Sequence, residues 1–208
     1  MENINKIRNY GIEYSTVMAV NKLNHRYVKE YLEITMNVEA THASLIPVMP
    51  SGRALSNRIY IDAQNYLEVL KIADHFSKIH SYPISLWCTP YAPLIVNSRF
   101  IRSSFCRTSS VVDISPSGDL LLCDVMDISI TSIKNRKLTE ALEEYQRDER
   151  VKVLINPPKL PSPCNSCPLR NLCRGGCFAR ASIIYGDVNA GDPLCPRVVK
   201  YYNEKQSL

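Results

Sequence analysis

The spacing of the cysteines constrains this chain more than any other feature of its sequence. Eight cysteines occur in 208 residues, and five of them fall between positions 164 and 195. Within this group the intervals are two, five, three and seventeen residues. A two-residue gap lets one loop turn both sulfurs toward a single metal centre. The complete set is Cys88, Cys106, Cys123, Cys164, Cys167, Cys173, Cys177 and Cys195.

The cellular compartment bears on the role of the cysteines, because disulfides are rare in the reducing cytosol. The opening residues, MENINKIRNYGIEYS, contain no apolar run suited to a signal peptide. No stretch approaches the roughly 20 apolar residues that a membrane span needs. We therefore expect a cytoplasmic protein that does not associate with membranes. Because the cytosol keeps thiols reduced, metal binding is the first hypothesis and a disulfide framework is not.

The net charge of the chain indicates whether it is suited to bind nucleic acid. The formal net charge is +5 at pH 7, with every cysteine counted as neutral. Four thiolates around a [4Fe–4S]²⁺ core carry a net charge of about −2, so two such sites would bring the total to roughly +1. This balance gives no support to nucleic-acid binding.

The first half of the chain alternates between β-rich and helical patterns. Residues 12–20, 43–49 and 83–87 have the pattern of strands, and residues 24–40 and 63–79 that of helices. Strands that alternate with helices of this length predict parallel β/α units. Three strands and two helices make an incomplete domain, because a parallel sheet normally has both faces and both edges covered.

The second half has a different character. A hairpin is predicted on either side of Pro116-Ser117-Gly118, followed by a charged helix over about 137–150. The four prolines of NPPKLPSP then exclude regular structure. A boundary near residues 92–100 follows, which divides the chain into domains 1–95 and 96–208.

The segment from Cys106 to Cys195 resembles the SPASM extension of radical S-adenosylmethionine enzymes. Two segments resemble those of the family branch that matures pyrroloquinoline quinone, mycofactocin and haem: ISPSGDLLLC and CRGGCFARASIIYGDVNAGDPLC. STVMAVNKLN and LIPVMPSGRAL resemble the later strands of the family's barrel. The resemblance implies an α/β fold: the C-terminal part of a partial parallel β/α barrel, followed by a small cluster-binding SPASM domain with a β-hairpin.

The same resemblance implies two auxiliary [4Fe–4S] clusters with interlaced ligands. The outer cluster would be held by Cys164, Cys167, Cys173 and Cys195. The inner cluster would be held by Cys106, Cys123 and Cys177. Cys88 either completes the inner cluster or is an ordinary buried thiol. In the second case one iron of that cluster stays open to substrate, water or a non-cysteine ligand.

One motif of the family is absent from this sequence. The family's catalytic cluster is bound by three cysteines spaced CxxxCxxC, and this spacing does not occur here. The resemblance therefore implies that the chain alone does not cleave S-adenosylmethionine. That cofactor would require an N-terminal half, which a separate polypeptide could supply. The substrates that the resemblance implies are peptides or tetrapyrroles. The auxiliary clusters would relay electrons during the reaction or anchor the substrate.

Two further classes of function are compatible with the cysteines. The first is a free-standing iron–sulfur electron-transfer protein, which needs no partner. The second is an interaction module stabilised by two Cys₄ zinc sites, which would use all eight cysteines. Zinc ribbons usually pair two CxxC knuckles, whereas this sequence has one, and this difference favours iron.

Overall fold

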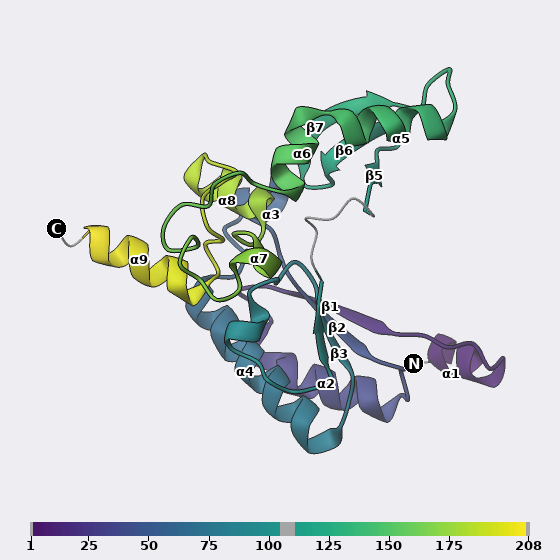
Figure 1. Cartoon of the computed structure of the whole chain (residues 1–208). Coiled ribbons are helices and arrows are strands. Elements are labelled where there is room, and N and C mark those ends of the chain that lie inside the picture. Colours follow the sequence, from purple (N-terminus) through teal and green to yellow (C-terminus); the bar gives the residue numbers. More distant parts are fainter. Residues whose placement is uncertain (1, 105–110, 207–208) are drawn as a thin grey trace. The chain divides into compact units, whose positions relative to one another are not determined.

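The computed structural model describes residues 2–104 and 111–206. The chain forms two compact units, whose elements are labelled in Figure 1. The first unit comprises residues 1–104 together with 194–208, and the second comprises residues 105–193. The C-terminal segment thus belongs to the unit in which the chain begins. The division into domains at residues 95 and 96 stays a prediction.

A four-stranded parallel sheet forms the centre of the first unit. Its strands, in spatial order, are β1 (Thr16–Val20), β2 (Ala43–Pro47), β3 (Ile84–Leu86) and β4 (Ile101–Ser103). All three pairings are parallel. The predicted parallel β/α arrangement is confirmed. The fourth strand was not expected, because three residues between loops give no periodic signal.

The first unit also contains helices of different lengths. They are α1 (Glu2–Asn9), η1 (His25–Tyr27), α2 (Val28–Asn37), α3 (Gly52–Ser56), α4 (Ala63–His80), η2 (Ala92–Leu94) and α9 (Pro196–Gln206). Helix α4 contacts both α2 and α9. It begins where the sequence predicts, because the Asp62 side chain accepts a hydrogen bond from the Asn65 amide at 2.9 Å. It ends at Ser81, whose φ of 51° breaks the helical path.

The core of the first unit consists of apolar side chains from the sheet and from α2 and α4. Fully buried members are Val20, Val28, Leu32, Leu45, Tyr66, Leu70 and Leu86. Their burial removes apolar surface from water, which is the main force that holds strand and helix layers together. Among the described residues, no helix combines the length and apolarity needed to cross a membrane.

The second unit contains a three-stranded antiparallel sheet. Its strands are β5 (Asp113–Ile114), β6 (Asp119–Cys123) and β7 (Met126–Ser132), in that order. The predicted hairpin is confirmed, since β5 and β6 pair across the Pro116-Ser117-Gly118 turn. Strand β7 was not predicted. The helices of this unit are α5 (Leu138–Arg147), α6 (Glu149–Ile155), α7 (Arg170–Cys173) and α8 (Phe178–Tyr185).

The single helix predicted over 137–150 is wrong. Asp148 adopts an extended conformation, with φ −65° and ψ 131°, and separates α5 from α6. Its carboxylate accepts a hydrogen bond from the Arg150 amide at 2.8 Å, so it caps the second helix. The break lets Tyr145 of α5 and Val151 of α6 pack with Leu120 in one small core.

Candidate metal centre

The cysteines lie at turns and at the ends of elements. Cys88 follows β3, Cys123 ends β6, Cys164 and Cys167 lie in a turn, Cys173 ends α7, Cys177 precedes α8 and Cys195 precedes α9. Cys106 lies outside the described residues. No disulfide joins any two of the seven cysteines that the structure describes. Each described cysteine therefore lies at a turn or at the end of a helix or strand.

The CxxC pair sits in a hydrogen-bonded turn. The Cys164 amide donates to the Pro161 carbonyl at 2.8 Å, and the Cys167 amide donates to the Cys164 carbonyl at 3.1 Å. The Arg170 amide in turn donates to the Cys167 carbonyl at 3.0 Å and leads into α7. The backbone of the pair is therefore fixed by its own hydrogen bonds, although prolines surround it.

The segment from Cys173 to Cys177 turns sharply. Arg174, Gly175 and Gly176 have φ values of 50°, 90° and 85°, three left-handed residues in succession. Glycine adopts this region without steric cost, which explains the two glycines. The Gly176 amide donates to the Cys173 carbonyl at 3.0 Å and closes the turn. The RGGC sequence thus brings the main chain from the end of one helix to the start of the next.

Cys177 occupies the N-cap of α8. Its sulfur lies 3.5 Å from the Arg180 amide, which donates to it. The cysteine is only 9% exposed. The N-terminus of a helix favours negative charge, so this position suits a thiolate ligand.

Cys123 and Cys177 lie within electrostatic reach of each other. Burial raises the pKa of the Cys123 thiol, and the negative charges of Asp124 and Cys177 raise it further, while a backbone hydrogen bond from Val125 opposes them. The Cys123 thiol donates to the Asp124 carboxylate at 3.5 Å. A thiol in such surroundings ionises readily only when a cation compensates its charge, as a coordinated metal does.

A buried ion pair supports the loop at Cys177. Nη1 of Arg180 lies 2.7 and 2.8 Å from the two carboxylate oxygens of Asp192. Asp192 Oδ2 also accepts the Cys177 amide at 3.0 Å. The sequence alone does not predict this pair. Charged residues are rarely fully buried, and nothing in the spacing of these two separates them from surface charges.

Cys88 is placed differently. It follows β3 with a φ of 51°, and its amide donates to the Ser104 hydroxyl at 3.3 Å. The next residue, Thr89, bonds through its hydroxyl to that of buried Tyr66 at 2.7 Å. The carboxyl ends of parallel strands are the usual location of sites in β/α folds, so the position of Cys88 is compatible with either of its predicted roles.

The donor set fits an iron–sulfur centre in its chemistry. Thiolates are the usual ligands of such clusters, and the described cysteines are not consumed by disulfides with one another. Within residues 2–104 and 111–206, however, no three His, Cys, Asp or Glu side chains converge closely enough to hold a metal ion. Of the sulfurs predicted for the inner cluster, Cys123 and Cys177 lie near enough for the charge of Cys177 to influence the pKa of Cys123, and the described residues gather no complete ligand set.

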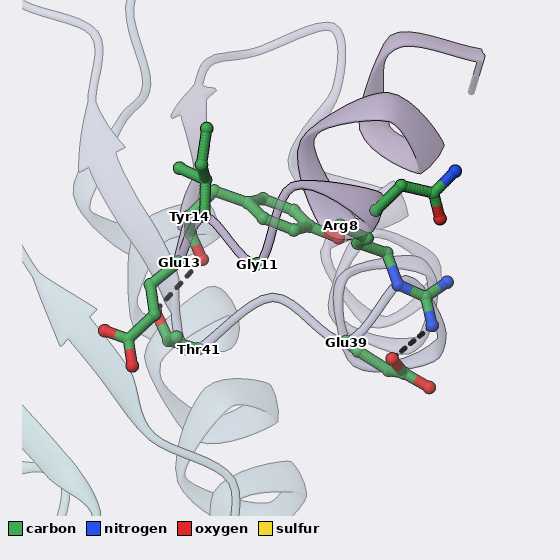
Figure 2. Close-up of a pocket in the computed structure, with 8 residues that line it drawn as sticks. Arg8, Gly11, Glu13, Tyr14, Glu39 and Thr41 are labelled. Carbon is green, nitrogen blue, oxygen red and sulfur yellow. Dashed lines mark hydrogen bonds and ion pairs between the residues drawn. The ribbon is translucent and has the colours of Figure 1, made fainter.

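The first unit also contains a polar pocket of about 460 Å³ near the end of α1. Figure 2 shows the side chains that line it, among them Arg8 paired with Glu39. The Thr41 hydroxyl donates to the Tyr14 carbonyl at 3.0 Å, and the Tyr14 hydroxyl donates to the Val38 carbonyl. These groups form hydrogen bonds and an ion pair within the pocket, and none of them is a cysteine of the predicted sites.

Comparisons with known proteins agree with the cysteine series. No family model matches the chain. It is 24% identical to an AdoMet-dependent heme synthase of Nitratidesulfovibrio vulgaris, over 94% of this chain and 57% of that protein. Over 90 residues, which are 41% of this chain and 23% of the relative, it is 29% identical to a PqqA peptide cyclase of Xanthomonas campestris pv. campestris.

A solved structure shares the fold. It is native anSMEcpe with bound AdoMet and a Cp18Cys peptide, with a TM-score of 0.62 and 14% identity, over 98% of this chain and 62% of that one. The chain spans little more than half the length of the heme synthase that it matches, at 57%. With the parallel sheet and the cysteine series, these similarities support a relationship of the chain to the C-terminal part of radical S-adenosylmethionine proteins of SPASM type.

Proposed function

We propose that this chain carries two auxiliary [4Fe–4S] clusters as the C-terminal portion of a radical S-adenosylmethionine maturase. The observation that carries the proposal is the cysteine series from Cys106 to Cys195, whose described members form no disulfide with one another. In addition, the negative charge of Cys177 contributes to the raised pKa of the Cys123 thiol, although the two residues lie far apart in sequence. Burial and the neighbouring Asp124 both disfavour the Cys123 thiolate, and a coordinated metal would supply the positive charge that stabilises it.

The proposed ligands are interlaced. One cluster takes Cys164, Cys167, Cys173 and Cys195, and the other takes Cys106, Cys123 and Cys177. Cys88 is the remaining candidate for the fourth ligand of the second cluster, and without it one iron stays open. A bound [4Fe–4S] cluster supplies one-electron redox chemistry, with a potential set by hydrogen bonds, charge and solvent exposure.

The protein's own groups prepare this environment. The N-cap of α8 favours negative charge on the Cys177 sulfur, and the turn at Gly175 and Gly176 brings backbone N–H groups close to the ligand positions. The small core around Leu120 holds the strand that ends at Cys123. These features would fix the main chain at Cys123 and Cys177.

The relatives support a proposal for the substrate class. The names of the matched proteins point to a tetrapyrrole or a peptide as substrate. We propose that cleavage of S-adenosylmethionine requires a CxxxCxxC half, which this chain does not contain and a separate polypeptide would provide. The proposed location of the assembly is the cytoplasm.

The first experiment asks which metal the chain holds. Protein purified anaerobically and reconstituted with iron and sulfide should bind about eight irons and eight sulfides per chain, with a broad visible absorption. A colourless protein that retains tightly bound zinc would overturn the proposal and support the Cys₄ zinc module instead. Iron near half of the expected content would reduce the proposal to a single cluster.

A second experiment separates a maturase portion from a free-standing electron carrier. The reconstituted chain should form no 5′-deoxyadenosine from S-adenosylmethionine and a strong reductant. Adding a polypeptide with the CxxxCxxC half, encoded beside this chain, should produce a stable complex and cleavage of the cofactor. Cleavage by this chain alone would contradict the proposed division of labour. The absence of any such reading frame, with full redox activity, would favour the electron carrier.

A further inference from the structure

We propose that Asp192 and Arg180 are a positioning pair for Cys177, in which Asp192 fixes the main chain of the cysteine and Arg180 balances the charge of Asp192. As far as it concerns the cluster, this inference rests on the proposed function. Its effect on the loop can be measured without any cluster. Neither residue is among the proposed ligands.

Asp192 contacts the loop at two points. Its carboxylate accepts the Cys177 amide at 3.0 Å, and its own amide donates to the Gly175 carbonyl at 2.9 Å. These bonds hold the main chain on both sides of Gly176. Because the Cys177 amide lies directly before the helix, fixing it also fixes the direction in which the cysteine side chain leaves the backbone.

Arg180 makes the burial of this carboxylate possible. The side chains of Arg180 and Asp192 are 2% and 1% exposed, and the guanidinium contacts both carboxylate oxygens. A buried ion pair often adds little net stability, because desolvation offsets the attraction. Removing one partner leaves an uncompensated buried charge, which is far more costly. A pair of this kind is therefore better explained by the geometry that it imposes than by stability.

The pair also sets the local charge. With both residues present their charges cancel beside Cys177, which is a proposed ligand of the inner cluster. Replacing Asp192 by asparagine leaves the positive charge of Arg180, which favours the reduced, more negative cluster and should raise its reduction potential. Replacing Arg180 by methionine leaves the negative charge of Asp192 and should lower that potential. Opposite shifts are the signature of an electrostatic role, since a merely structural defect has no reason to change sign.

The first test uses hydrogen exchange of the unreconstituted chain. In Asp192→Ala the Cys177 amide should exchange at least about tenfold faster than in the wild type, because its acceptor is gone. Asp192→Asn retains an acceptor oxygen, so the Cys177 amide should exchange more slowly in this variant than in Asp192→Ala. Asp187 offers a matched control, because its carboxylate accepts the Asn189 amide at 2.8 Å in an exposed turn. Asp187→Ala should leave the Cys177 amide unchanged. Equal exchange at Cys177 in folded Asp192→Ala and wild type would overturn the positioning role.

The second test uses the reconstituted protein and its redox titration. The inner-cluster potential should rise in Asp192→Asn, fall in Arg180→Met, and return toward the wild-type value in the double variant. Shifts of the same sign in both single variants would refute the charge balance. Cys177→Ala distinguishes the two proposals: if this variant keeps both clusters unchanged, the ligand assignment fails, while the hydrogen-exchange result still decides the role of Asp192.

Discussion

A Cβ atom placed on Gly176 would lie 2.4 Å from the Cβ of Asp192, closer than real side-chain atoms approach one another. Gly176 also has a φ of 85°, which side chains other than glycine rarely adopt. Two independent constraints therefore act on one residue of the RGGC turn. The close approach is what allows the Asp192 carboxylate to reach the Cys177 amide.

Gly176→Ala should consequently disrupt the loop. We expect a loss of about 2–5 kcal/mol in local stability, since the left-handed backbone costs about 1–2 kcal/mol and the clash about 1–3 kcal/mol. In the reconstituted protein the cluster held by Cys177 should be lost first. Hydrogen exchange of the amides between 173 and 180, with iron analysis, measures both effects.

Gly186 provides the control for this substitution. Its φ is 73°, but no atom outside its neighbours lies within 4 Å of the added Cβ position. Gly186→Ala should therefore cost only the backbone strain, about 1–2 kcal/mol, and leave the iron content unchanged. Equal effects of the two substitutions would show that the contact with Asp192 is unimportant.

The interlaced assignment of the ligands predicts different losses for two cysteines of the same segment. Cys167→Ala should remove the iron of one cluster and leave the spectrum of the other intact. Cys177→Ala should damage the opposite cluster, because Cys177 and Cys123 are proposed ligands of the same cluster. Electron paramagnetic resonance of the reduced proteins, with iron counts, distinguishes the two. If both substitutions remove the same cluster, the assignment is wrong.

Local signals in the sequence predict several elements correctly. Helix α4 begins at Ala63, where the predicted helix begins, and the turn at Pro116-Ser117-Gly118 joins two antiparallel strands. Both depend on residues close together in the chain, where capping and turn preferences act directly. The strand pattern also predicts the parallel sheet, because strands separated by helices pair in parallel.

Features that depend on distant residues were not predictable in this way. Strand β4 has three residues and exists only because it pairs with β3. The break at Asp148 is favoured by packing of α5 and α6 around Leu120, which a continuous helical pattern does not reveal. The Arg180–Asp192 pair likewise arises when the fold brings two segments together. The cysteine spacing gave the ligand hypothesis, whereas the groups that support Cys177 required coordinates.

The small core of the second unit predicts a local loss of stability. Leu120 is fully buried against Ala141, Tyr145 and Val151. Leu120→Ala should cost about 2–5 kcal/mol, because it removes apolar contacts and leaves a cavity. Leu138 of α5 is 48% exposed, and Leu138→Ala should cost well under about 1 kcal/mol. Hydrogen exchange of the β6 and β7 amides measures the difference, and equal protection in both variants would contradict this description of the core.

Asp74 predicts a pH-dependent contribution to the first unit. Its carboxylate accepts the amides of Asn97 and Ser98 at 2.9 and 2.8 Å and the Lys78 ammonium at 2.5 Å. Burial by itself raises the pKa of Asp74, but the hydrogen bonds from Lys78, Asn97 and Ser98 together outweigh it, so the pKa is lowered. The ionised carboxylate therefore ties α4 to the loop before β4.

Asp74→Ala should destabilise the first unit by about 1–3 kcal/mol at pH 7, because two backbone amides lose their acceptor. Since the folded pKa lies below the unfolded one, the charge-dependent part of this stability is present above the unfolded value. It is lost as the pH falls through the folded value. The gap in unfolding free energy between the wild type and Asp74→Asn should thus begin to narrow below about pH 5.

Denaturant unfolding of the unreconstituted chain between pH 7 and pH 3 measures this gap. Glu68→Ala, at an exposed position of α4, is the control and should show little change at any pH. A gap that widens toward acid would mean that the carboxylate is protonated in the folded protein.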